Sequence, residues 1–146
     1  MNEKIILLVE DNPDDAELTR IAFEEAGSSH VLEHVGDGAE ALDYLFGRGR
    51  HAARAGKPLP AVVLLDLNLP KLSGREVLQA LRADARTRAL PVVVLTTSVE
   101  PFDVDDVYAL GANSYIQKPV EFDRFIEAAR QIGVYWLGLN QVPGSA

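Results

Sequence analysis

The chain has 146 residues, with 22 acidic against 14 basic side chains, a formal charge of −8 and no cysteine. A chain of this length hides roughly 70% of its unfolded surface, which suits one soluble globular domain and excludes two full-sized ones. The lack of cysteine excludes disulfides, thiolate metal sites and cysteine nucleophiles, and the negative charge disfavours nucleic acid, whose phosphates attract clustered Lys and Arg.

The first half of the chain predicts strands and helices in alternation, over residues 5–9, 13–26, 31–35 and 37–46. The run at 5–9 is apolar at every position, which is typical of a strand buried on both faces of a sheet. A membrane span needs about 20 apolar residues, and no export-signal pattern surrounds this short run, so we expect a cytoplasmic protein with no membrane contact. The run at 31–35 contains a glutamate and a histidine, which predicts a strand at a sheet edge.

Residues 47–60 form a basic segment rich in glycine, alanine and proline. Its cations and histidine are Arg48, Arg50, His51, Arg54 and Lys57. We expect a short extension of the preceding helix and then an exposed, solvated loop. Docking to a partner is the second interpretation, and nucleic-acid binding the third, because aromatic stacking residues are absent.

The second half of the chain continues the alternation. Strands are expected at 61–65, 91–95 and 114–117. One helix is expected after the capping box at 73–76, and two more over 103–110 and 121–137. The helix at 121–137 places Phe122 and Trp136 with other apolar side chains on one buried stripe. Residues 1–138 are therefore predicted to form the domain and residues 139–146 a flexible tail.

This alternation predicts an α/β fold with parallel strands and helices on both faces of the sheet. The three apolar strands belong in the centre, and the polar second and fifth strands belong at the edges. The expected strand order is therefore 2-1-3-4-5, the flavodoxin-like doubly wound arrangement of five strands and five helices.

Charged and hydroxyl side chains stand directly after four of the predicted strands: Glu10, Asp11, Asp66, Thr96, Thr97 and Lys118. Ligands of such sheets bind beyond the carboxyl ends of the strands, so we expect these side chains at one rim. Three carboxylates at one place repel each other and require a cation, and Mg²⁺ prefers oxygen ligands of this kind. Lys118 alone leaves two negative charges uncompensated, so its ammonium group could hold an incoming anion.

The same groups suit phosphoryl transfer, which needs an in-line nucleophile and positive charge around the equatorial oxygens. Asp66 is the candidate nucleophile, because carboxylates form aspartyl-phosphate intermediates, and Thr96 would supply a hydroxyl group to the phosphoryl group. Taken singly, Asp11 could be a helix cap and Asp66 a turn residue. Their joint occurrence with Thr96 and Lys118 at four strand ends favours a functional site.

At these residues the chain resembles the receiver domain of two-component response regulators, across nearly its whole length. The resemblance rests on Glu10-Asp11, Leu65-Asp-Leu-Asn-Leu-Pro70, Gly74, Thr96 and Tyr115-Ile-Gln-Lys118-Pro119. It implies that Asp66 accepts a phosphoryl group from a sensor histidine kinase and that Thr96 and Lys118 grip that group. The Mg²⁺ ligands that it implies, direct or through water, are Glu10, Asp11, Asp66 and the backbone carbonyl of Asn68.

The resemblance also implies a switch, in which Tyr115 turns inward when Thr96 is drawn to the phosphoryl group. It further implies a cis peptide bond between Lys118 and Pro119. Tyr115 could equally be an ordinary aromatic of an edge strand, and Asn68 could be only a turn former. Glu10 replaces the aspartate common in the family, which leaves open whether its contact with the metal is direct or through water.

A narrower resemblance is to single-domain regulators paired with phytochrome-type histidine kinases. It rests on the sequences at 67–71, 74–78, 95–98 and 135–137 and on the basic segment. It implies a phytochrome kinase as the phosphoryl donor and a downstream protein as the target. The face formed by 103–110, 114–117 and 121–137 is the one that the family uses for partners and homodimers. Such a protein catalyses its own phosphorylation and slow dephosphorylation and is not a turnover enzyme.

Two other function classes share parts of the pattern. A magnesium-dependent phosphohydrolase of the haloacid dehalogenase type would carry two aspartates separated by one residue after one strand, whereas Glu10 and Asp11 are adjacent. A flavodoxin-like cofactor-binding module would carry a Ser, Thr or Gly phosphate cradle after the first strand, where this chain has acids. Turnover of phosphate monoesters or a yellow colour would identify either alternative.

Overall fold

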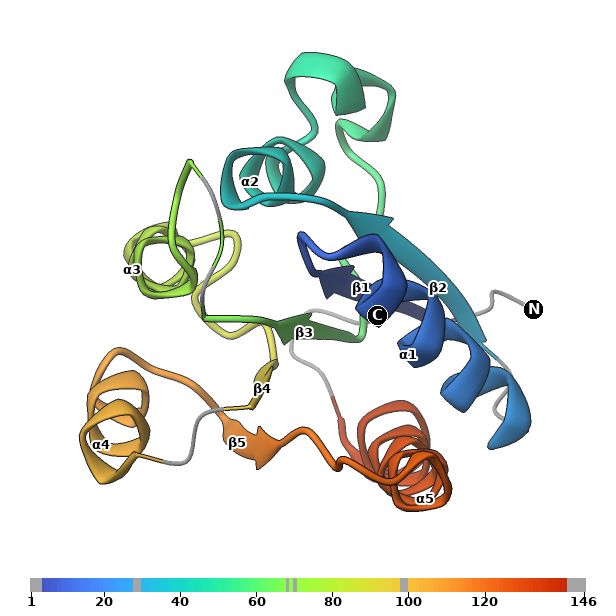
Figure 1. Ribbon diagram of the computed structural model, residues 1–146. Coiled ribbons are helices and arrows are strands. Elements are labelled where there is room, and N and C mark those ends of the chain that lie inside the picture. The colour runs from blue at the N-terminus through green and yellow to red at the C-terminus, as the bar shows by residue number, and fades with distance from the viewer. Residues whose placement is uncertain (1–3, 28–29, 68, 70, 98–99, 142–146) are drawn as a thin grey trace.

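The computed structural model describes residues 4–27, 30–67, 69, 71–97 and 100–141. Within these ranges the centre of the protein is a parallel sheet of β1 (Lys4–Val9), β2 (His30–Val35), β3 (Val62–Leu65), β4 (Val92–Thr96) and β5 (Ser114–Gln117). The strands lie in the order β2-β1-β3-β4-β5 (Figure 1), which confirms the predicted flavodoxin-like topology.

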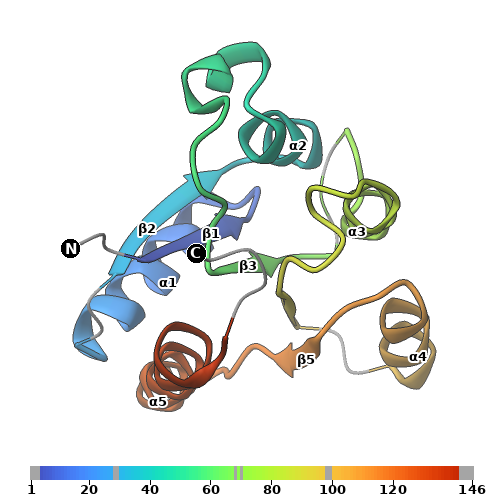
Figure 2. The same cartoon turned by 180° about the vertical axis from the view of Figure 1, so that it is seen from behind.

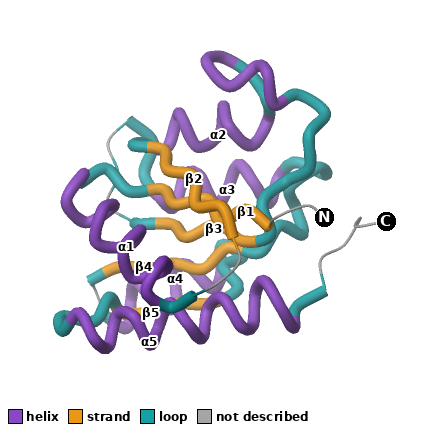
Figure 3. The backbone as a smooth tube through the Cα atoms, turned by 90° about the vertical axis from the view of Figure 1, so that its right-hand side faces the viewer, coloured by secondary structure: helices purple, strands orange, loops and turns teal. Residues whose placement is uncertain are grey.

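Helices cover both faces of the sheet: α1 (Pro13–Glu25), α2 (Gly38–Phe46), α3 (Gly74–Ala83), α4 (Pro101–Ala109) and α5 (Phe122–Ile132). Figure 2 and Figure 3 show α1 and α5 on one face and α2, α3 and α4 on the other. The helix starts follow local sequence, because the Asn12 side chain accepts hydrogen bonds from the N–H groups of Asp14 and Asp15 at 2.9 and 3.2 Å. No helix in the described ranges is long and apolar enough to cross a membrane.

Alternate residues of the central strands build two separate cores. Ile6 and Leu8 of β1 pack with Phe23 on the α1 and α5 side, whereas Leu7 and Val9 pack on the side of α2, α3 and α4. β3 and β4 are buried along their whole length, while most residues of β2 and β5 are partly or fully exposed. The predicted assignment of central and edge strands is therefore confirmed, because apolar residues at every position require a helix layer on each face.

The end of the chain differs from the prediction of one helix over 121–137. The α-helix ends at Ile132 and continues as a π-helical segment, η2 (Gly133–Leu139). Phe122 is 37% exposed, so the predicted stripe fails at its start, whereas Trp136 is partly buried against the core on the α1 and α5 side. The wider winding of a π-helix moves later residues out of the 3.6-residue phase. Because η2 includes Leu139 and residues 142–146 lie outside the described part, the boundary of the tail remains a prediction.

The basic segment is also more ordered than the expected helix extension and loop. Gly47, with a φ of 64°, ends α2 in the left-handed conformation that glycine adopts readily. A separate 3₁₀ segment, η1 (Gly49–Arg54), then follows. A glycine stop directly after Phe46 is why the α-helix does not continue.

Arg82, at the end of α3, should contribute strongly to stability. Its guanidinium donates hydrogen bonds to five acceptors, the carbonyls of Thr87, Arg88, Leu90 and Gly111 and the side-chain oxygen of Asn113, at 2.8–3.1 Å. Burial lowers the pKa of Arg82, and none of these five acceptors is a carboxylate that would raise it.

We expect Arg82→Met to lower the free energy of unfolding by about 2–4 kcal/mol, because several partly buried carbonyls lose a charged donor at once. Urea denaturation followed by circular dichroism measures this loss. Arg88→Met, in the loop after α3 and with an exposed side chain, is the matched control and should change the free energy of unfolding little. Equal stability of the two variants would contradict this role for Arg82.

Candidate functional site

The carboxyl ends of β1 and β3 bring three carboxylates together. Val9 pairs with Leu65, so Glu10 and Asp11 leave β1 at the level where Asp66 leaves β3. The N–H of Asp66 donates to the carbonyl of Val9 at 3.2 Å and extends the strand pairing by one residue. Glu10, Asp11 and Asp66 each offer a carboxylate oxygen, and these oxygens lie within 4.8 Å of one another.

The three carboxylates differ in exposure. Glu10 is 2% exposed, Asp66 is partly exposed and Asp11 is exposed. The cluster therefore has a buried back and an open front that faces solvent. An oxygen-only donor set that is open on one side fits a hard divalent cation that keeps some of its water ligands.

Lys118 approaches the cluster from the end of β5. Its ammonium group forms an ion pair with Glu10, and Nζ lies 4.0 Å from Oδ2 of Asp15. Its backbone N–H donates to the carbonyl of Thr96 at 2.7 Å, which fixes Lys118 next to the end of β4. One ammonium beside three carboxylates leaves negative charge in excess, which a cation would neutralise.

The environment of Glu10 shows the balance of forces in the cluster. Burial raises the pKa of Glu10, and the negative charge of Asp66 raises it further. The ion pair with Lys118 and the N–H of Asn12, 3.3 Å from Oε2, act in the opposite direction. Burial prevails, so the pKa of Glu10 lies above its ordinary value, and a cation at this site would stabilise the ionised form.

His34 is a neighbour of the site that sequence reasoning missed. Its Nε2 lies 2.7 Å from the backbone carbonyl oxygen of Glu10, on the exposed side of β2. The register of β2 on β1, in which His34 is opposite Leu8, places the two groups together. Only the strand pairing reveals this contact, because 24 residues separate His34 from Glu10.

Gly74 allows α3 to start directly against the backbone of Asp66. A Cβ atom at Gly74 would lie 2.4 Å from the carbonyl oxygen of Asp66 and 2.8 Å from Cα of Leu67, so only glycine fits without a shift. The N–H of Gly74 donates to the carbonyl of Leu67 at 3.0 Å. The start of α3 therefore holds the turn that carries Asp66.

The remaining predicted site residues have different outcomes. Thr96 ends β4 and is 1% exposed, and Tyr115 on β5 is partly buried against the core on the α3 and α4 side. Asn68 lies outside the described residues. The predicted cis bond before Pro119 is wrong, because the described residues contain no cis peptide bond. Trans is the intrinsically favoured isomer even before proline, and Lys118 reaches Glu10 with the bond in this form.

A family model described as the response regulator receiver domain matches residues 6–130. The probable methanogenesis regulatory protein FilR2 of Methanothrix harundinacea is 46% identical over 97% of this chain and 89% of the relative. The response regulator Rcp1 of Synechocystis sp. is 35% identical over 97% of this chain and 95% of the relative.

Solved structures show the same similarity in three dimensions. The phosphorylated cyanobacterial phytochrome response regulator RcpA aligns with a TM-score of 0.87 and 37% identity, over 97% of this chain and 99% of that one. The Mn²⁺-bound form of Rcp1 aligns with a TM-score of 0.84 and 36% identity, over 96% of this chain and 99% of that one. The bacteriophytochrome response regulator RtBRR aligns with a TM-score of 0.79 and 48% identity, over 98% of this chain and 86% of that one.

Proposed function

The chain belongs to the response regulator receiver family, as the match over residues 6–130 shows, and from this premise we propose that Asp66 accepts a phosphoryl group from the phosphohistidine of a sensor histidine kinase in a magnesium-dependent reaction. The observation that carries the proposal is the meeting of Glu10, Asp11 and Asp66 within 4.8 Å, with Lys118 bonded to the buried member. A structural role alone does not account for three carboxylates of like charge at one open rim.

In the proposed step a carboxylate oxygen of Asp66 forms a bond to phosphorus while the P–N bond of the phosphohistidine breaks. The electron pair of that bond returns to the imidazole of the kinase, which takes up a proton. Lys118 and the hydroxyl group of Thr96 would hold the transferred oxygens, since Thr96 ends β4 beside β3 and the backbone N–H of Lys118 bonds to the carbonyl of Thr96. Hydrolysis of the acyl phosphate by water would then restore Asp66 slowly, without turnover of a separate substrate.

Glu10, Asp11 and Asp66, with the backbone carbonyl of residue 68, would hold the cation. The family binds a divalent metal, and the Mn²⁺-bound form of Rcp1 is consistent with the acidic cluster of this chain. We assign Mg²⁺ because all side-chain donors are oxygen atoms and the open front leaves room for water and a phosphoryl oxygen. The bound ion would supply positive charge that offsets the repulsion between Asp66 and its anionic donor.

Phosphorylation would act as a switch through Lys118, Thr96 and Tyr115. The phosphoryl group brings a charge of about −1.5 to −2 in place of one carboxylate charge. Lys118, now bonded to Glu10, would have to divide its contacts between that carboxylate and the phosphoryl group. A shift from 1:99 to 99:1 needs roughly 5.5 kcal/mol, so cation, ammonium and hydroxyl group would have to act together, with Tyr115 following Thr96.

We assign a phytochrome-type kinase as the donor, because the phytochrome response regulator RcpA and the bacteriophytochrome response regulator RtBRR align along nearly the whole chain. The exchange belongs in the cytoplasm, where such a kinase would present its phosphohistidine. Phosphotransfer from a purified phytochrome kinase should exceed that from unrelated kinases by about tenfold or more in kcat/KM, or ~1.4 kcal/mol. Rates measured with radiolabelled kinases test this assignment, and equal rates would contradict it.

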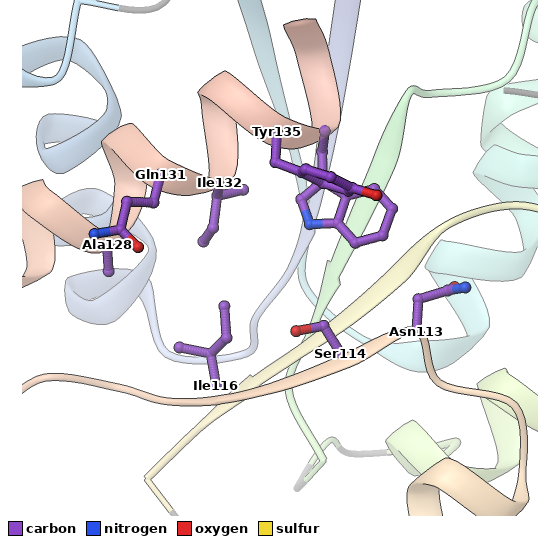
Figure 4. Close-up of a pocket in the computed structure, with 8 residues that line it drawn as sticks. Asn113, Ser114, Ile116, Ala128, Gln131, Ile132 and Tyr135 are labelled. Carbon is purple, nitrogen blue, oxygen red and sulfur yellow. The ribbon is translucent and has the colours of Figure 1, made fainter. Parts of the chain in front are cut away.

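A partner or a second copy of the chain would bind the face formed by α4, β5 and α5. Beside β5 lies a pocket of about 540 Å³ where Ile116 and Ile132 approach each other from strand and helix, below Tyr135 (Figure 4). Tyr135 is 49% exposed and Leu139 is 67% exposed, so apolar surface continues past the pocket. Exposed apolar side chains around a pocket at a sheet edge favour an interface here.

We expect Tyr135→Ser to weaken self-association of the phosphorylated protein by about tenfold or more, because an aromatic anchor at such a face supplies much of the binding energy. Sedimentation equilibrium measures the dimer constant. Leu18→Ser, which removes a 45% exposed apolar side chain from α1, is the control. Identical dimer constants for both variants, or a wild-type protein that stays monomeric, would remove this interface from the proposal.

The two alternative functions receive no support from the comparisons. The receiver family model covers most of the chain, and the relatives reported above are regulators rather than phosphohydrolases or flavin proteins. Glu10 and Asp11 directly follow β1, where a flavodoxin-like module would need a phosphate cradle, and they are adjacent rather than separated by one residue as in the phosphohydrolases.

A further inference from the structure

The basic segment is a built surface rather than a loose loop. His51 bonds to Oε2 of Glu40 on α2 at 2.9 Å, and its ring meets the ring of Tyr44 edge-on at 5.2 Å. The guanidinium of Arg54 lies over the ring of Tyr44, with Cζ 3.9 Å from the ring centre. Because Tyr44 is 4% exposed, these contacts fix η1 to the buried side of α2.

A second segment, distant in sequence, adds cations to the same surface. Arg48 and Arg86 lie over the ring of Phe46, with Cζ 5.2 and 4.6 Å from its centre. Arg86 belongs to the loop after α3, as does Arg88, whose charge helps to lower the pKa of Asp84. We call the set of Arg48, Arg50, Arg54, Lys57, Arg86 and Arg88 the basic platform.

The platform is positive in a chain whose formal charge is −8. No acidic residue occurs between Asp43 and Asp66, while this stretch holds four of the 14 basic residues. Within the described residues, the carboxylates that pair with the platform are Glu40, Asp43 and Asp84, half as many as its cations. The surface therefore keeps positive charge after its own ion pairs are counted.

Three of its guanidinium groups are exposed and already bind carboxylates. Arg48 pairs with Asp43 at 3.0 Å, Arg50 with Glu40 at 3.3 Å and Arg86 with Asp84 at 2.9 Å, and the three arginine side chains are 58%, 74% and 65% exposed. Exposed pairs of this kind add little to stability, so further carboxylates can join or replace them. The ring of Phe46 and the anchored η1 hold the donors in place, which reduces the ordering cost of binding.

Among the described residues, the carboxylates that pair with the platform are not those of the phosphoryl site. The helices of a parallel α/β fold run opposite to the strands, so Arg48 after α2 and Arg86 after α3 lie at the rim where the strands begin, whereas Arg50 reaches back to Glu40 in the first turn of α2. Asp66 lies at the other rim, where the strands end. Figure 1 shows the connection after α2 projecting beyond the sheet, away from α5. A molecule that binds Arg48 and Arg86 would therefore lie at the rim opposite Asp66.

From these observations we propose that the basic platform docks an acidic segment, rich in Asp and Glu, of a partner protein. A short acidic segment matches the exposed guanidinium groups, which bind carboxylates in forked geometry. A long polyanion such as nucleic acid would extend past the platform onto a surface with an excess of negative charge, which repels it. The proposal does not depend on the phosphorylation of Asp66.

The test is binding of a fluorescent octaglutamate peptide to the full chain, measured by anisotropy at low salt. Wild-type protein should bind the peptide, and Arg48→Gln/Arg50→Gln/Arg86→Gln should weaken binding by about tenfold or more. The control, Arg20→Gln/Arg124→Gln/Arg130→Gln, removes the same charge from α1 and α5, where the Arg20 side chain is 42% exposed and Arg124 and Arg130 are exposed, and it should change binding less than about threefold. Circular dichroism confirms that both triple variants fold.

Three outcomes would overturn the proposal. The first is wild-type protein that does not bind octaglutamate. The second is an equal loss in both triple variants, which would mean that only net charge matters. The third is single-stranded DNA of eight nucleotides binding more tightly than the peptide with the same dependence on Arg48, Arg50 and Arg86, which would assign the platform to nucleic acid.

Discussion

Asp66→Asn should abolish phosphoryl incorporation from acetyl phosphate, with a loss of more than about 100-fold, or ~2.7 kcal/mol in activation free energy. The amide has no anionic oxygen to attack phosphorus and cannot form the acyl phosphate. The fold should remain intact, because the substitution removes one of three carboxylates that repel each other and keeps the shape of the side chain. Acid-labile radiolabel measures incorporation, and circular dichroism measures the fold.

Asp84→Asn is the matched control for this experiment. It changes the same functional group in the loop after α3, where Asp84 pairs with Arg86 outside the carboxylate cluster. Its labelling should equal that of the wild-type protein. Undiminished labelling of Asp66→Asn would place the acceptor at another residue and would falsify the proposed reaction.

Removal of the divalent cation should have a comparable effect. EDTA should stop labelling, and excess Mg²⁺ should restore it, because the carboxylates left uncompensated by Lys118 repel an anionic donor. Asp11→Asn should weaken Mg²⁺ binding by about tenfold or more, measured by calorimetry at neutral pH. Saturation with Mg²⁺ should also stabilise the wild-type protein, by ~2.7 kcal/mol at 100 times the dissociation constant.

Asp14→Asn is the control for the metal site. Asp14 lies three residues after Asp11 in the first turn of α1 and is exposed, but it is not a member of the cluster. It should leave the affinity for Mg²⁺ unchanged. Labelling that continues in EDTA, or the absence of binding heat when Mg²⁺ is titrated into the wild-type protein, would contradict a role for the metal in the phosphorylation of Asp66.

Much of the site follows from the sequence because its residues stand at or directly after the ends of predicted strands. Asp66 comes directly after the buried β3, and Lys118 comes directly after β5. Parallel strands end at one rim, so strand order alone predicts that these side chains gather there. The family resemblance adds the chemistry, and the match over residues 6–130 confirms the family.

Other features needed contacts between distant segments. The bond between His34 and the carbonyl of Glu10 depends on the register of β2, and the position of Arg86 over Phe46 depends on the packing of α2 on α3. The basic segment is mostly exposed, as expected, but its sequence does not show that Tyr44 and Glu40 would anchor it. The π-helical end of α5 was missed because helical periodicity assumes 3.6 residues per turn.

The sequence by itself therefore determined the order of the elements, the strands that are central and the side chains that reach the rim. These depend on burial patterns and helix caps that act within a few residues. Only the tertiary structure decided that Lys118 pairs with Glu10, that Glu10 is the buried member of the cluster and that two basic segments form one platform. Such pairings depend on distances through space between residues up to 108 positions apart, which no local pattern encodes.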